Sequence, residues 1–288
     1  MSEVIVHVLG TAQDAGLPHP NCFCENCLRA MQNPAAKRTA ASLAVVLPEE
    51  KSWHLIDATP DLKEQMIHLQ IKYNLKEQLM ASIFLTHAHL GHYPGLLFFG
   101  KEAMNTHKMP VFVGEKMENL LKKDAPWIQL TTQENIRLKQ MESQQEIKLS
   151  TQVSIIPIEV PHRNEFSETF GFWIQKQNKK ILYIPDIDRW EQWDVNIYEA
   201  CKEADICLLD GTFYSEQDFK EIDRDPREIP HPLITDTMER LQSLTEQTEI
   251  YFVHLNHSNP VLNPNSNARA VLEKRGFHIA EDGMEFIL

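Results

Sequence analysis

A short histidine-rich segment follows a run of apolar residues near the first third of the chain. The segment Thr86–His92 contains three histidines and comes directly after the strand-like run Ala81–Leu85. A tight loop at the end of a buried strand can turn several imidazoles toward one ion. A solvated, histidine-rich loop is the alternative interpretation. The segment predicts one half of a metal site, because histidines and aspartates recur after later strands.

The same pattern of an apolar run followed by a metal-binding side chain occurs three more times. His162 follows a run at 154–156, Asp186 follows one at 181–183, and His254 follows one at 251–253. A single such residue is usually just a turn residue, but a repeated pattern favours a common site. Imidazole and carboxylate ligands together suit zinc, manganese or iron. The candidate ligands are His87, His89, His92, His162, Asp186 and His254.

Three cysteines lie within six residues near the N-terminus, at Cys22, Cys24 and Cys27. The chain has five cysteines, an odd number that does not indicate a disulfide framework. In a reducing compartment this spacing predicts a structural zinc site at about 20–30, whose fourth ligand comes from elsewhere. Chance clustering of buried cysteines is the alternative.

The hydrophobic pattern predicts one α/β domain over 1–288, with no linker or repeat dividing it. The predicted strands are 4–10, 43–47, 53–57, the run at 83, 111–113, 152–160, 169–175, 181–184, 206–209 and 250–255. Predicted helices begin at Thr59 and cover 94–104, 115–122, 234–244 and 267–274, the last ended by a left-handed Gly276. The polar region 124–149 gives no clear assignment. Several strand ends therefore carry histidine or aspartate to one edge, where α/β proteins place chemistry.

Charge and hydropathy narrow the class of partner. The formal net charge is −13, from 28 basic and 41 acidic residues, and opposes attraction to nucleic acid or anionic membranes. No apolar run approaches the length of a membrane span, and no signal-peptide pattern is present. We therefore expect a cytoplasmic protein that acts on a small molecule, without a nucleic-acid or membrane partner.

Taken together, the six candidate ligands make the chain resemble the metallo-β-lactamase-fold superfamily. The family signature is a His-x-His-x-Asp-His loop followed by a His, a bridging Asp and a final His, each after a strand. The candidate ligands match it in order, and Asp57 matches the family's structural aspartate. The resemblance implies an α/β fold that is a four-layer αββα sandwich of two mixed sheets, with one or two metal ions at one edge. Dimers are common in this fold, so the resemblance also leaves a homodimer open.

Gly91 is the one departure from the signature, because the family has aspartate there. The family aspartate binds the second metal, so a glycine should weaken that site. Alternatively, Gly91 simply eases the turn. Both interpretations can hold together.

Within the superfamily, the N-terminal cysteines resemble two branches. One is the pyrroloquinoline quinone biosynthesis protein B (PqqB) group, and the other is a phosphodiesterase of phosphonate degradation (PhnP). Closer similarity to the PqqB group lies in three segments, Leu9–Gly16, Tyr183–Asp188 and His254–Pro260. Members of that group have a degraded histidine loop, whereas His87 and His89 are retained here. In the phosphodiesterase a late histidine closes the zinc site, which implies His231 as the fourth ligand; in RNA-processing relatives such a histidine serves catalysis.

These observations favour a metal-dependent hydrolase, with zinc the first choice of ion and iron or manganese as alternatives. Asp186 would orient the nucleophilic water, and His257 or Asp188 would protonate the leaving group. Asp188 and Asp210 could instead orient ligand imidazoles, and Asp14 and His19 lie in a loop that passes near the metals in this fold. The bond cleaved could be a phosphodiester, ester, amide or lactone. The alternatives are a PqqB-like metal-dependent oxygenase on an amino-acid-derived substrate and a non-catalytic metal carrier.

Overall fold

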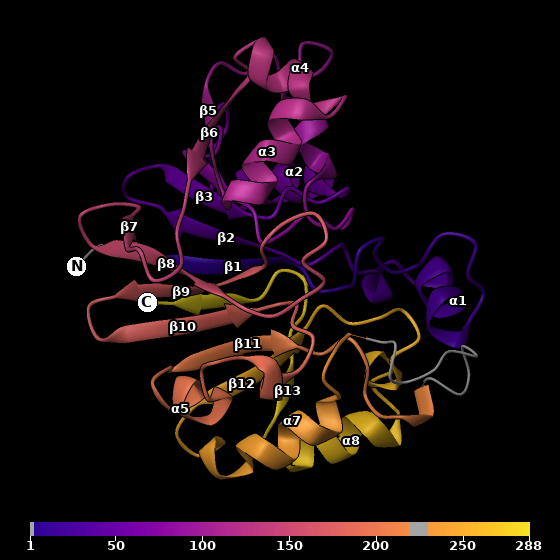
Figure 1. The fold of residues 1–288 in the computed structure, drawn as a ribbon. Coiled ribbons are helices and arrows are strands. Elements are labelled where there is room, and N and C mark those ends of the chain that lie inside the picture. The colour runs from indigo at the N-terminus through magenta and orange to yellow at the C-terminus, as the bar shows by residue number, and fades with distance from the viewer. Residues whose placement is uncertain (1–2, 219–229) are drawn as a thin grey trace.

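Two seven-stranded sheets lie face to face in the computed structural model, which describes residues 3–218 and 230–288 (Figure 1). The first sheet has the spatial order β14 (Glu285–Ile287), β1 (Ile5–Gly10), β2 (Ser42–Leu47), β3 (Ser52–Ile56), β4 (Ser82–Phe84), β5 (Met109–Val113) and β6 (Ile136–Gln140). The second has the order β13 (His278–Ile279), β12 (Glu249–Val253), β11 (Ile206–Asp210), β10 (Lys179–Ile184), β9 (Phe170–Lys176), β8 (Val153–Glu159) and β7 (Ile147–Lys148).

Both sheets are mixed, and their parallel portions matter most for the site. In the first sheet β3, β4, β5 and β6 run parallel to one another. In the second sheet β10, β11, β12 and β13 do the same. Parallel neighbours end at a common edge, so residues that follow them gather in one place.

Helices cover the outer face of each sheet (Figure 1). The first sheet is covered by α2 (Leu62–Lys72), α3 (Glu115–Lys123) and α4 (Trp127–Thr132). The second is covered by α5 (Ile197–Lys202), α7 (Ile234–Leu241) and α8 (Asn267–Lys274), while α1 (Glu25–Gln32) lies to one side. This arrangement confirms the predicted four-layer αββα sandwich of two mixed sheets. Within the described residues, no helix has the length and apolar character needed to cross a bilayer.

Most of the predicted elements are present, and the differences have local causes. The helix predicted over 94–104 is only a 3₁₀ segment, Pro94–Phe99, because Gly100 ends it in extended backbone. The unassigned region 124–149 contains α4, β6 and β7, of which β6 and β7 are edge strands with weak apolar alternation. Gly276 has φ +84°, which confirms the predicted left-handed cap.

The interface between the sheets is built from aromatic and branched side chains. Phe84 on β4 is fully buried there, stacks on Phe112 with ring centroids 4.6 Å apart, and meets Phe172 of the opposite sheet edge-on at 6.1 Å. Since β4 leads directly into the histidine loop, this packing also fixes where the loop begins.

Removing this ring should therefore destabilise the whole sandwich. We expect Phe84→Ala to lower the free energy of unfolding by about 3–5 kcal/mol, because the substitution leaves a cavity between the sheets. Chemical denaturation would measure the loss. Phe166→Ala is the matched control, since Phe166 is 65% exposed, and should change stability by no more than about 0.5 kcal/mol. Equal effects of the two variants would contradict this packing.

Candidate metal centre

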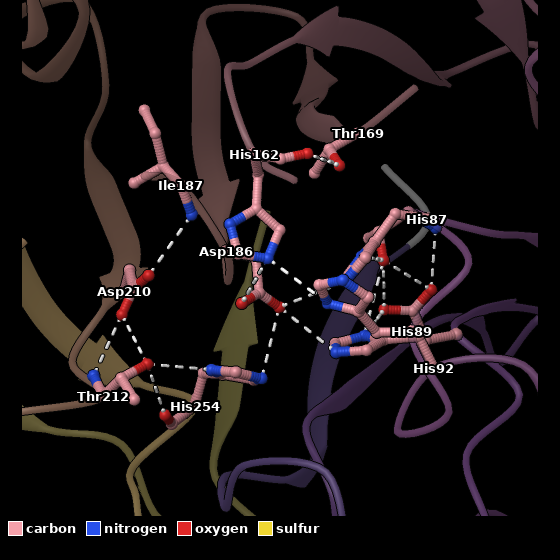
Figure 2. A network of polar contacts seen from close by, with 12 residues as sticks. His87, His89, His92, His162, Thr169, Asp186, Ile187, Asp210, Thr212 and His254 are labelled. Atoms are coloured by element: carbon pink, nitrogen blue, oxygen red, sulfur yellow. Dashed lines mark hydrogen bonds and ion pairs between the residues drawn. The ribbon is translucent and has the colours of Figure 1, made fainter. Parts of the chain in front are cut away.

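The six predicted ligands lie together at one edge of the two sheets (Figure 2). We call them the rim cluster: His87, His89, His92, His162, Asp186 and His254. The first three follow β4, and the others follow β8, β10 and β12 respectively. Every member except His89 is buried, and most residues of the strands that lead to the cluster are buried too. The packing of both sheets therefore helps to hold the cluster in place.

Asp186 is the centre of the rim cluster, and Figure 2 shows imidazoles converging on its carboxylate. Its Oδ2 lies 3.1 Å from His92 Nε2 and 3.2 Å from His254 Nε2. The same oxygen is 3.9 Å from His87 Nε2, and Oδ1 is 3.5 Å from His162 Nε2. The carboxylate is thus shared between the histidine loop of one sheet and the strand ends of the other.

Several atoms of this centre are buried without a hydrogen-bond partner among the described residues. They are His87 Nε2, His92 Nε2, His254 Nε2 and Asp186 Oδ2. An unpaired polar atom in a protein interior costs free energy, and a bound cation would satisfy these atoms together. The three ring nitrogens approach Asp186 Oδ2 closely without hydrogen-bond geometry. The donor set therefore fits a cation.

The rim cluster offers two adjoining ion positions. The ring nitrogens of His87, His89 and His162 lie within 4.8 Å of one another, and His162 Nε2 is 3.3 Å from His89 Nδ1. A second set consists of His92 and His254, with Asp186 reaching both sets. Three imidazoles with an open fourth position are typical of catalytic zinc.

Two hydroxyl groups orient the ligand rings. Thr86 Oγ1 donates to the buried Asp57 and therefore accepts a hydrogen bond from His87 Nδ1 at 2.9 Å. Thr212 does the same in the other sheet: its Oγ1 donates to Asp210 at 2.7 Å and accepts from His254 Nδ1 at 3.0 Å. With Nδ1 protonated, each ring presents the Nε2 lone pair toward Asp186.

Carboxylates orient two more rings. His92 Nδ1 lies 2.7 Å from Asp57 Oδ2, and His162 Nδ1 lies 2.9 Å from Asp188 Oδ1. Of the two roles predicted for Asp188, this contact favours orientation of a ligand imidazole over catalysis. The sequence pattern gives no sign of these orienting roles, although Thr86 directly precedes His87 and Thr212 lies two residues after Asp210.

Burial and neighbouring charges set the protonation of the cluster. Burial lowers the pKa of His87 and His254 well below the usual range, and that of His89 to about 4. These rings are therefore neutral, the form that binds metal. Burial opposes charge on His92, but Asp57 and Asp186 outweigh it and raise its pKa.

His231 lies at the rim and not at the cysteines. Its Nδ1 is 2.8 Å from Asp210 Oδ2 and 3.7 Å from Asp186 Oδ1. Burial lowers its pKa, but Asp210 outweighs burial and raises the pKa above its usual value. The prediction that His231 closes the structural zinc site is wrong, because this ring is held between two rim carboxylates.

The ring beside the three thiols is His257, and together they form the thiol cluster: Cys22, Cys24, Cys27 and His257. His257 Nδ1 lies 3.4, 3.5 and 3.8 Å from the Sγ atoms of the three cysteines in that order. Asn26 Nδ2 donates to the carbonyl oxygen of His257 at 3.1 Å and holds the two segments together. Three thiols and one imidazole match a tetrahedral zinc site. His257 therefore does not serve as the predicted proton donor at the rim.

Comparison with known proteins agrees with this geometry. A model of the Beta-lactamase superfamily domain matches residues 52–255. Coenzyme PQQ synthesis protein B of Rhizobium meliloti is 28% identical over an alignment of 309 residues, which covers 99% of this chain and 98% of that protein. The homologous protein of Nitrosococcus oceani is 26% identical, with 99% and 100% covered.

Solved structures show the same fold over the full length. Zn²⁺-bound PqqB from Methylobacterium extorquens has a TM-score of 0.81 at 24% identity and covers 99% of this chain and 100% of that one. A diphosphatase of the PhnP family has a TM-score of 0.71 at 22% identity, with 99% and 97% covered. The resemblances to PqqB and to PhnP that the sequence indicates are thereby confirmed.

Substitutions in the thiol cluster test whether His257 or His231 is the fourth ligand of the structural zinc ion. We expect Cys24→Ser and His257→Ala each to remove one zinc ion per chain and to lower the melting temperature, because structural zinc contributes folding free energy. His231→Ala should keep that ion. Zinc content by ICP mass spectrometry and thermal unfolding measure both effects. Full zinc content and unchanged melting in Cys24→Ser would sink the structural-zinc assignment.

Proposed function

The chain belongs to the beta-lactamase superfamily, a superfamily of metal-dependent hydrolases, and from this premise we propose that it is a zinc-dependent hydrolase of a small-molecule substrate. The observation that carries the proposal is the convergence of buried, unpaired imidazole nitrogens on Asp186 Oδ2. Such an arrangement serves no structural purpose by itself, because it leaves polar atoms buried and unsatisfied.

The rim residues have distinct roles in this proposal. His87, His89 and His162 would hold one zinc ion and His92 and His254 a second, and the Asp186 carboxylate lies next to both sets of rings. Zinc bound there would supply a water of lowered pKa as nucleophile and would polarise the scissile group. Asp186, with its pKa held below the usual range by the surrounding imidazoles against the effect of burial, stays ionised to orient that water.

His231 is the proton donor to the leaving group in this scheme. Its Nδ1 bonds Asp210, so the ring is fixed and its protonated form is favoured by the adjacent carboxylate. It lies beside Asp186, where the reacting bond would sit. Neither of the donors predicted from sequence fits as well, since His257 lies at the thiols and Asp188 holds His162.

The substrate class follows from charge and chemistry. A formal charge of −13 opposes a large polyanion, so a small phosphodiester or ester is the preferred substrate. Zinc is preferred over iron or manganese because three of the rim ligands are imidazoles on one ion with an open position.

One alternative has an observation in its favour. The curated relatives are named for coenzyme PQQ synthesis and match 98% or more of this chain. Imidazoles with one carboxylate also suit iron. An oxygenase acting on an amino-acid-derived substrate would explain both facts, and a metal carrier would bind the ions without turnover.

The loss of one rim ligand tests the hydrolase proposal. The protein, purified without added metal, is assayed against bis(p-nitrophenyl) phosphate, p-nitrophenyl acetate and a homoserine lactone, with oxygen uptake recorded in parallel. We expect rim zinc, hydrolysis of one of these bonds, and at least about a hundredfold lower kcat in His89→Ala. His107→Ala removes an exposed histidine elsewhere and is the matched control. Rim iron with oxygen consumption would overturn the proposal in favour of the oxygenase.

A second variant tests the role of His231. We expect His231→Gln to keep the zinc content and to lower kcat by about 10²–10⁴-fold for a substrate with a poor leaving group. The loss should be much smaller for a nitrophenolate, which needs no proton. An equal loss for both leaving groups would show that His231 is not the acid.

A further inference from the structure

Gly91, where the superfamily has an aspartate, lies against Asp14 of the first loop. A Cβ atom placed on Gly91 would be 2.3 Å from Asp14 Oδ1 and 2.5 Å from Asp14 Cα. Both distances are far below van der Waals contact. The space of a side chain at 91 is therefore filled by the Asp14 carboxyl group.

Backbone conformation does not explain the glycine. The glycines with positive φ in the described residues are Gly16, Gly276 and Gly283, and Gly91 is not among them. Gly91 therefore does not adopt the left-handed conformation that would by itself require glycine at a turn. What requires glycine is the close approach of the first loop.

The Asp14 carboxylate reaches the part of the rim that lacks a ligand. A carboxylate oxygen of Asp14 and ring nitrogens of His92 and His254 lie within 4.8 Å of one another. Asp14 is half-buried, and among the described residues no hydrogen bond holds its carboxylate. It is thus an oxygen ligand in position without another structural task.

The first loop is fixed to the segment that carries His254. Leu255 N–H donates to the Thr11 carbonyl at 2.8 Å, and Gln13 N–H donates to the Leu255 carbonyl at 2.9 Å. The side chain of Asn256 also donates to Gln13 Oε1, at 2.7 Å. These three bonds lie immediately before Asp14 in sequence and set its distance to His254.

The backbone of Asp14 is itself unusual. Its φ is +39°, a region that residues other than glycine seldom adopt. Aspartate tolerates it better than most, and such conformations persist where the surrounding structure holds them, commonly at functional sites. The strained turn is what directs the carboxyl group toward Gly91.

We propose that Asp14 supplies the carboxylate ligand of the second metal position, with His92, His254 and the shared Asp186, in place of the aspartate that Gly91 replaces. The assignment rests on the proposed function, because it completes the rim described there. It restores an oxygen ligand and a negative charge to a position that otherwise has two imidazoles and the shared Asp186 carboxylate.

Metal affinity tests the assignment independently of turnover. The protein is stripped with a chelator and titrated with zinc alone against a chromophoric chelator, and cobalt spectra identify the thiol cluster by its thiolate absorption. We expect three zinc ions in the wild type. In Asp14→Asn, one rim ion should bind at least about tenfold more weakly while the other two are unchanged. Unchanged affinity of all three ions, or a wild type that holds a single rim ion whose affinity Asp14→Asn leaves unchanged, would overturn the proposal.

Gly91→Ala tests the role of Asp14 as a ligand without changing Asp14 itself. Its methyl group must displace the Asp14 carboxylate, so it should weaken the same ion although alanine removes no ligand. The double variant should lose no more affinity than Asp14→Asn alone, since both changes act through one carboxylate. Additive losses would contradict the mechanism.

Two controls separate this inference from its premise. Asp236→Asn removes the same charge at an exposed position on α7 and should leave all affinities unchanged. Asp14→Ala tests the same ligand if Asp14→Asn folds poorly, and apo-protein melting reports the fold. A wild type that binds two rim ions through Asp14 yet hydrolyses nothing would sink the proposed function and leave the Asp14 assignment standing.

Discussion

The buried carboxylate of Asp186 is the constraint on which the rest of the structure depends. It is 1% exposed, and the rings of His87, His92, His162 and His254 point at it from two different sheets. A buried anion surrounded by mostly neutral imidazoles is unfavourable unless a cation shares the space. Packing and the hydrogen bonds behind the rings therefore hold an arrangement that a metal ion would make favourable. That is pre-organisation of a binding site at the cost of stability.

Each sheet contributes a similar device for holding its half of the rim. In the first sheet Asp57 holds His92 directly and holds His87 through Thr86. In the second sheet Asp210 holds His231 directly and holds His254 through Thr212. Both aspartates are fully buried at the ends of parallel strands. The side chain that binds metal is thus oriented by one that the fold has already immobilised, which explains how loops can place ligands accurately.

The rim cluster could be predicted because each member directly follows a strand, and parallel strands bring their ends to one edge. The path of a loop follows no such rule. His231 and His257 both stand in loops, and the structure places each ring where the sequence predicts the other. The sequence shows that three thiols need a fourth ligand but not which ring reaches them. The region 124–149 gives no clear sequence pattern because its elements are short or lie at sheet edges. The edge strands β6 and β7 need little apolar alternation.

A short segment of the chain, from His254 to His257, connects the rim cluster with the thiol cluster. His254 and His257 are three residues apart, and the chain turns sharply at His254, whose φ is +60°. One ring consequently faces Asp186 and the other faces the cysteines. The residues between them, Leu255 and Asn256, bond the first loop and so position Asp14. An ion held by the thiols would therefore brace the segment that carries His254 on one side and Asp14 on the other. The thiol cluster lies outside the rim, yet with its ion bound it would stabilise the part of the rim where this chain has Gly91 instead of the family aspartate.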